Sequence, residues 1–73
     1  MYKNLTFLNK KSRHKIDKCI QHNFELQPVL RNKRTHIFRN SIFSISVDRK
    51  ITRVLIYEQH NFELEKKLQE ILG

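Results

Sequence analysis

Cysteine, glycine and proline each occur only once in the 73 residues, and tryptophan is absent. With Cys19 as the lone thiol and no Cys/His cluster of zinc spacing, neither a disulfide framework nor a structural metal site is predicted. One glycine and one proline leave no room for flexible linkers. We expect a single domain over residues 1–73, without metal or cofactor. Its core should be marginal, because so short a chain buries only about 60% of its unfolded surface.

Long apolar runs are missing as well. No stretch approaches the roughly 20 consecutive apolar residues of a membrane span. The first eleven residues place their few apolar side chains before their positive charges, which is the reverse of a secretory signal. Together with the unpaired cysteine, this pattern predicts a cytoplasmic protein with no membrane partner.

Motifs of the common enzyme classes are also absent. The chain has no glycine-rich phosphate loop and no HExxH, CxxC or GxSxG sequence. Nucleotide hydrolysis, zinc proteolysis and triad hydrolysis are therefore not supported. Non-enzymatic binding is the favoured interpretation, and any enzyme would have to use histidine, arginine, lysine and tyrosine without a metal.

What the chain does have is positive charge, and it is distributed unevenly. Residues 1–40 carry ten Lys and Arg against Asp17 and Glu25, a net +8, whereas residues 41–73 carry five basic and five acidic residues, a net zero. A one-sided positive field is typical of proteins that bind polyanions, most often nucleic acid. An AT-biased, lysine-rich genome is the alternative explanation. The candidate nucleic-acid-binding residues are Lys10, Lys11, Arg13, Lys15, Lys18, Arg31, Lys33, Arg34 and Arg39.

A basic amphipathic helix is predicted from about residue 10 to residue 24. Its apolar stripe, at i, i+3, i+4 and i+8, consists of Ile16, Cys19, Ile20 and Phe24. Either Asn9 or Ser12 is suited to cap its start. The opposite, basic face suits phosphate contacts, although a solvated helix face has the same pattern. Pro28 stops the helix, and residues 27–32 are predicted to be extended before a turn at residues 32–34.

Two antiparallel strands are predicted in the second half of the chain. Phe43, Ile45 and Val47 alternate with polar residues, residues 48–50 form a polar break, and residues 51–57 resume as a β-branched, apolar run. Residues 54–57 are apolar on both faces, which predicts a central strand covered on both sides.

The alternation slips just before this pair. A strand that begins near His36 changes parity between Phe38 and Ile42, which we interpret as a bulge or bend at residues 39–41. Asn61 is a plausible N-cap for a closing helix, and residues 4–8 could add a first strand. The predicted class is α+β: a three- or four-stranded antiparallel sheet with an N-terminal basic helix and a C-terminal helix, in the order (β)-α-β-β-β-α.

Five side chains in or beside these strands form the set that a metal-free ribonuclease uses: a general base, cations for the phosphorane and a general acid. Each also has a structural interpretation, as a strand-end surface residue, an arginine on a solvated sheet face or a core tyrosine with its hydroxyl at the edge. The candidate catalytic residues are His36, Arg39, Arg53, Tyr57 and His60.

The run from Arg39 to Asp48, a short turn, the strand to Tyr57 and then Gln59-His60-Asn61 resemble the C-terminal half of the RelE/ParE toxin superfamily. The resemblance covers about half the chain, and the front has room for one helix where that family usually has a helical hairpin. It implies action on RNA or the ribosome, with Arg39, Arg53, Tyr57 and His60 as site residues. Residues 35–38 also resemble the histidine-bearing strand of HicA-type toxins.

Two classes of function follow. The first is a small basic protein that binds nucleic acid or the ribosome, in which a toxin-like action on RNA is an option. The second is a phage- or plasmid-type interaction module or inhibitor that binds an acidic host protein without catalysis, or pairs with a protein partner or a second copy through an open sheet edge.

Overall fold

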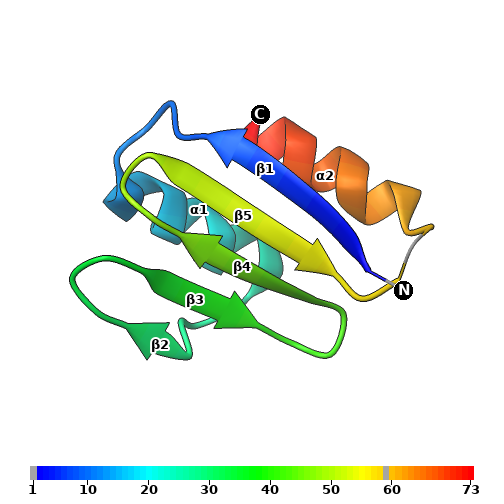
Figure 1. Ribbon diagram of the computed structural model, residues 1–73, viewed down its shortest axis with the longest axis horizontal. Coiled ribbons are helices and arrows are strands. Elements are labelled where there is room, and N and C mark those ends of the chain that lie inside the picture. The colour runs from blue at the N-terminus through cyan, green and yellow to red at the C-terminus, as the bar shows by residue number, and fades with distance from the viewer. Residues whose placement is uncertain (1, 59) are drawn as a thin grey trace.

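The computed structural model describes residues 2–58 and 60–73, which form a five-stranded antiparallel sheet and two helices. The elements are β1 (Lys3–Leu8), α1 (Arg13–Phe24), β2 (Leu30–Arg31), β3 (His36–Arg39), β4 (Phe43–Val47), β5 (Ile51–Ile56) and α2 (Phe62–Leu72). The predicted α+β class is confirmed, as are the first strand and the two helices on either side of a run of antiparallel strands, but this run has four strands rather than three, so the sheet has five strands rather than three or four (Figure 1).

The additional strand comes from the slip in the alternation, which marks a hairpin and not a bulge. The Asn40 side chain accepts hydrogen bonds from the backbone N–H groups of Ile42 and Phe43 at 2.8 and 2.9 Å. This Asx-type turn reverses the chain, so that β3 ends at Arg39 and pairs with β4. Residues 36–47 therefore contain two strands, β3 and β4, joined by this turn.

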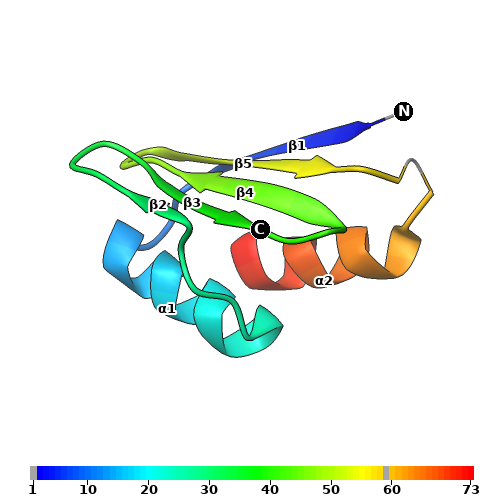
Figure 2. The ribbon, with the colours of Figure 1, turned by 90° about the horizontal axis from the view of Figure 1, so that it is seen from below.

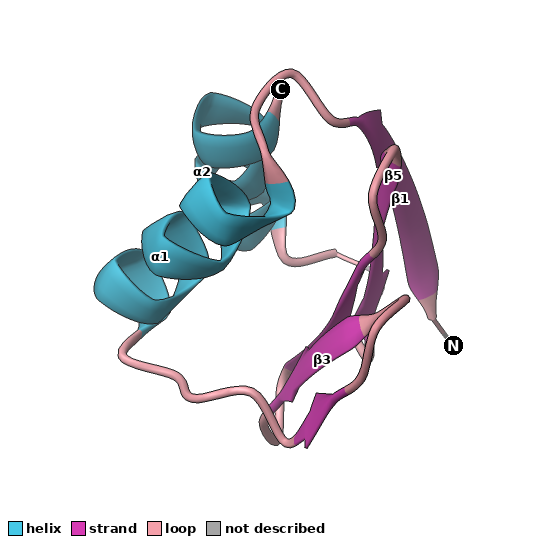
Figure 3. Cartoon of the chain, turned by 90° about the vertical axis from the view of Figure 1, so that its left-hand side faces the viewer, coloured by secondary structure: helices cyan, strands magenta, loops and turns pink. Residues whose placement is uncertain are grey.

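Strand order in the sheet is β1-β5-β4-β3-β2, with each neighbouring pair antiparallel. Strand β5 is an interior strand, as the prediction of a central strand requires, because it pairs with β1 over six residues and with β4 on its other side. Both helices, however, lie on the same side of the sheet (Figures 2 and 3). The prediction that β5 is covered on both faces is wrong: Arg53 on its other face is exposed and Leu55 is only half-buried.

The core fills the space between the helices and the sheet. Side chains of alternating strand positions meet the apolar stripes of the helices there, and Phe24 of α1 packs edge-on against Phe43 with ring centroids 5.0 Å apart. The fully or nearly fully buried apolar residues are Ile16, Ile20, Phe38, Phe43, Ile45, Val47, Val54, Ile56, Leu68 and Leu72.

Local signals set the helix ends. Ser12 caps α1 by accepting from the N–H of Lys15, so the helix starts at Arg13 rather than near residue 10. Asn61 caps α2, as predicted. Asn9 does not cap α1. Its side chain instead donates to the carbonyl of Asp48 at 2.7 Å and accepts from the buried hydroxyl of Thr52 at 2.6 Å, which fixes the start of the β1–α1 loop against the β4–β5 turn.

Candidate functional site

Three connections meet at one end of the sheet: the β1–α1 loop (residues 9–12), the β2–β3 turn (residues 32–35) and the β4–β5 turn (residues 48–50) (Figure 1). The two turns lie together because every second turn of an antiparallel meander is at the same end of the sheet. Backbone and side-chain hydrogen bonds join them. The N–H of Asn9 donates to the carbonyl of Lys50 at 2.8 Å, and the Arg13 guanidinium donates to the carbonyl of Lys33 at 2.9 Å.

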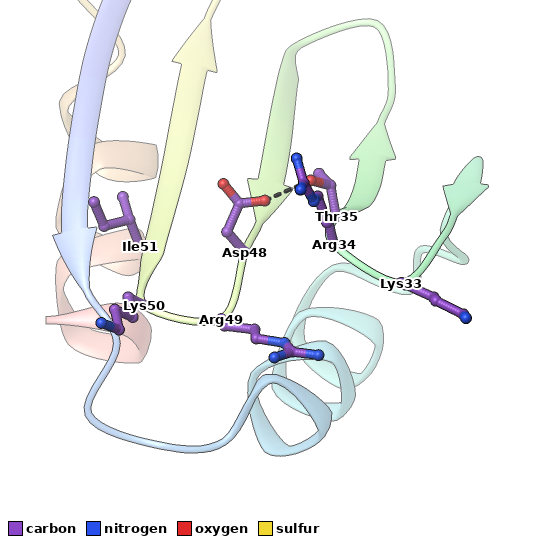
Figure 4. A pocket seen from close by; sticks show the side chains of 7 residues that line it. All are labelled: Lys33, Arg34, Thr35, Asp48, Arg49, Lys50 and Ile51. Carbon is purple, nitrogen blue, oxygen red and sulfur yellow. Dashed lines mark hydrogen bonds between the residues drawn. The ribbon is translucent and has the colours of Figure 1, made fainter.

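Seven basic side chains project from these three connections and the first residue of α1. All except the half-buried Arg13 are exposed. Four of them line one pocket of about 670 Å³ together with Thr35, Asp48 and Ile51 (Figure 4). We call this surface the basic end; it consists of Lys10, Lys11, Arg13, Lys33, Arg34, Arg49 and Lys50.

One carboxylate, Asp48, lies in that pocket, and it is already engaged. Its Oδ1 accepts a hydrogen bond from the Thr35 hydroxyl, which ties the β4–β5 turn to the β2–β3 turn (Figure 4). Asp48 therefore fixes the geometry of the basic end. The cations around it are left facing solvent, with a potential that a polyanion would complement.

A second hollow, of about 570 Å³, adjoins the basic end through Arg13. It lies between α1 and the β2–β3 hairpin, because Arg31 of β2 and His36 of β3 both project from the helix-facing side of the sheet. We call it the α1 hollow. Its lining residues are Arg13, His14, Asp17, Lys18, Gln21, Arg31 and His36.

Asp17 and His36 form a pair at the back of the α1 hollow. Asp17 is only 4% exposed, and its Oδ2 contacts Nδ1 of His36, whose side chain is 13% exposed. A carboxylate can only accept, so Nδ1 of His36 is the donor in this contact and Nε2 is left for other partners. The other oxygen of Asp17, Oδ1, is buried without a hydrogen-bond partner among the described residues. A buried carboxylate with only one oxygen hydrogen-bonded is unfavourable for folding stability, which points to a role in function.

The structure does not gather the five candidate catalytic residues. His36 lies on the helix-facing side of the sheet, whereas Arg39 and Arg53 project from the opposite face. Tyr57 follows β5 at the other end, where its ring packs edge-on against Tyr2 at 5.9 Å. His60 is exposed beside Phe62, just before α2. Of the five, only His36 lies in a hollow that is also lined by a second histidine, a carboxylate and basic side chains.

The candidate nucleic-acid-binding residues are partly brought together. Five of the nine belong to the basic end, and Lys18 and Arg31 line the adjoining α1 hollow. Lys15 is exposed elsewhere on α1, and Arg39 lies at the far end of β3.

Four residues of this region were not among the sequence candidates. Arg49 and Lys50 belong to the electrically neutral half of the chain, and the signal that could have found them is the hairpin itself, since its turn must lie beside the turn two strands away. His14 and Asp17 are one turn apart on α1 and flank the hollow, with Asp17 beside the apolar stripe.

The face of the sheet opposite the helices has no covering element among the described residues. Exposed apolar side chains on it include Leu8 of β1 and Leu30 of β2, at 73% and 48% exposure. The sequence prediction of a protein partner or second copy at an open face or edge stays a prediction.

No family model, curated protein or solved structure matches this chain. The resemblance to RelE/ParE toxins therefore stays a prediction that depends on the sequence alone. Within the described residues, neither helix is both long and apolar enough to cross a membrane. Nor do residues 2–58 and 60–73 contain three His, Cys, Asp or Glu side chains grouped as a metal site.

Proposed function

We propose that the protein binds nucleic acid, free or within a nucleoprotein such as the ribosome, through the basic end. One observation carries the proposal: segments from residues 10–13, 33–34 and 49–50, far apart in the sequence, place seven cations on one edge of the molecule. Flexible cations on turns suit phosphate oxygens, which are contacted by charge rather than by base identity. Contacts of this kind favour binding that is independent of nucleotide sequence and sensitive to salt.

The positions of the acidic side chains bear on the side from which a polyanion approaches the molecule. In the pocket of the basic end and in the α1 hollow, the carboxylates are engaged, Asp48 by Thr35 and Asp17 by His36. Exposed Glu70 lines another pocket with Lys10 and Lys11. The exposed residues Glu58 and Glu63 lie beyond β5 and in the first turn of α2, the end opposite the three connections (Figure 1). A polyanion is therefore expected to approach from the basic end. A nucleic-acid partner also agrees with the cytoplasmic location predicted from the sequence.

Replacing Arg49 and Lys50 by glutamine tests the proposal at two residues that the structure adds to the sequence candidates. Both come from the electrically neutral half of the chain. Two lost phosphate contacts should weaken binding to single-stranded RNA and flatten its salt dependence, lowering the slope of log K against log salt by about 1.4. Fluorescence anisotropy with a labelled RNA at several salt concentrations measures both quantities.

The matched control removes the same charge from elsewhere. Lys3→Gln with Lys66→Gln also deletes two exposed cations, neither of them in the basic end. It should leave the slope within experimental error of the original protein. Equal effects of the two double variants would show that only net charge matters, and would contradict a localised interface.

A further inference from the structure

The α1 hollow is lined by side chains that phosphate binding alone does not require. Two histidines, His14 and His36, line it together with three cations, Arg13, Lys18 and Arg31. A cavity of about 570 Å³ is within the size range of small-ligand sites. It also continues directly from the basic end, because Arg13 lines the hollow and donates to the carbonyl of Lys33 in the β2–β3 turn.

We propose that the α1 hollow is a metal-free ribonuclease site, in which His36 is the general base and His14 the general acid. The inference rests on the proposed function, because the RNA would be held by the basic end while one of its phosphates enters the hollow. Asp17 is the positioning residue: by accepting from Nδ1 of His36, it fixes the ring and leaves Nε2 as the base.

The reaction needs no co-reactant. Nε2 of His36 takes the proton of a ribose 2′-hydroxyl, and the 2′-oxygen attacks the adjacent phosphorus to form the P–O2′ bond. The P–O5′ bond breaks, and the departing 5′-oxygen takes a proton from protonated His14. The products are a 2′,3′-cyclic phosphate and a 5′-hydroxyl, and the two histidines have exchanged protonation states. Arg13, Lys18 and Arg31 provide the positive charge that stabilises the pentacoordinate phosphorane.

Burial of Asp17 is what distinguishes this arrangement from a surface group of basic residues. The carboxylate is 4% exposed, lines the hollow, and has one oxygen without a hydrogen-bond partner in the part of the chain that the structure describes. Asp17 therefore both orients His36 and stabilises the imidazolium that forms when His36 accepts the proton.

The test uses the whole protein, a 5′-labelled single-stranded RNA of mixed sequence and the same oligonucleotide made entirely of 2′-deoxynucleotides, all in EDTA. The RNA should be cleaved to fragments that end in 2′,3′-cyclic phosphate, and the DNA should be bound but left intact. His36→Asn keeps a side-chain N–H able to donate to Asp17 but removes the base, and should slow cleavage by about 10²–10⁴-fold.

His14 provides a second variant, and because its side chain is exposed, replacing it should not disturb the core. His14→Gln should slow cleavage by at least about 10²-fold, while His22→Gln, an exposed histidine of the same helix outside the hollow, should not. Asp17→Asn should lower kcat with little change in KM, since a positioning residue acts on the step and not on binding.

The outcomes separate the two proposals. An RNA that is bound but never cleaved would overturn the ribonuclease site and leave the binding function standing. Cleavage that persists unchanged in both His14→Gln and His36→Asn would also overturn it, because the activity would then come from elsewhere. Failure to bind either oligonucleotide would overturn the proposed function itself.

Discussion

Replacing His36 by alanine is expected to lower the free energy of unfolding by about 3–5 kcal/mol, because it removes the hydrogen-bond donor that faces the buried carboxylate of Asp17. Oδ1 of Asp17 already has no hydrogen-bond partner among the described residues, so the loss of His36 would leave neither carboxylate oxygen bonded at a position that is 4% exposed. A domain of this size is stabilised by only about 5–10 kcal/mol, so much of the population would unfold under mild conditions. Urea unfolding monitored by circular dichroism measures the change.

His36→Asn is the matched control. Its side-chain amide can donate to Asp17 from a position close to that of Nδ1, so the hydrogen bond is kept and the substitution should cost no more than about 1 kcal/mol. If alanine and asparagine destabilised the protein equally and by less than about 1 kcal/mol, the contact between Asp17 and His36 would not be an important link between α1 and β3.

Replacing Phe38 by alanine should cost a similar 3–5 kcal/mol, for a different reason. The ring is completely buried on the helix-facing side of β3 and belongs to the cluster shared by the strands and both helices. Its deletion removes a large apolar area from the core and leaves a cavity that a short, hydrogen-bonded strand cannot readily close. The same unfolding experiment reports the loss.

The neighbouring Ile37→Ala provides the comparison, since it lies on the same strand but faces the uncovered side of the sheet. Ile37 is only half-buried, so its truncation should cost clearly less, at about 1 kcal/mol. A cost for Ile37 as large as that for Phe38 would mean that the open face is covered in solution, and would contradict a two-layer structure.

The strand region shows how far the sequence could predict the fold. Alternation at Phe43, Ile45 and Val47 predicts β4 correctly, and its pairing with β5 follows from the polar break at residues 48–50. The slip near Asn40 is ambiguous in the sequence, because a bulge and a tight turn both change parity. The structure decides for the turn through the antiparallel pairing of β3 with β4 and the two backbone N–H groups that donate to the Asn40 side chain.

The candidate site was less predictable, because it is assembled from tertiary neighbours. Charge counted along the chain favours the first forty residues, yet Arg49 and Lys50 join that group once β3 and β4 reverse direction. In the sequence, Asp17 is one of two acidic residues in a basic segment, and nothing in the charge pattern marks it as buried. Its role depends on the rotation of α1 over β3, which the helical pattern alone does not specify.

The most direct test of the central claim is the affinity of the unmodified protein for a single-stranded RNA of about 20 nucleotides, measured from about 50 to about 400 mM salt. Seven cations in one place predict a linear fall of log K with log salt, with a slope of about −3 to −5. Substitution of Arg49 and Lys50 should make that slope shallower. Affinity that does not change with salt, or a slope that the substitution leaves untouched, would contradict nucleic-acid binding at the basic end.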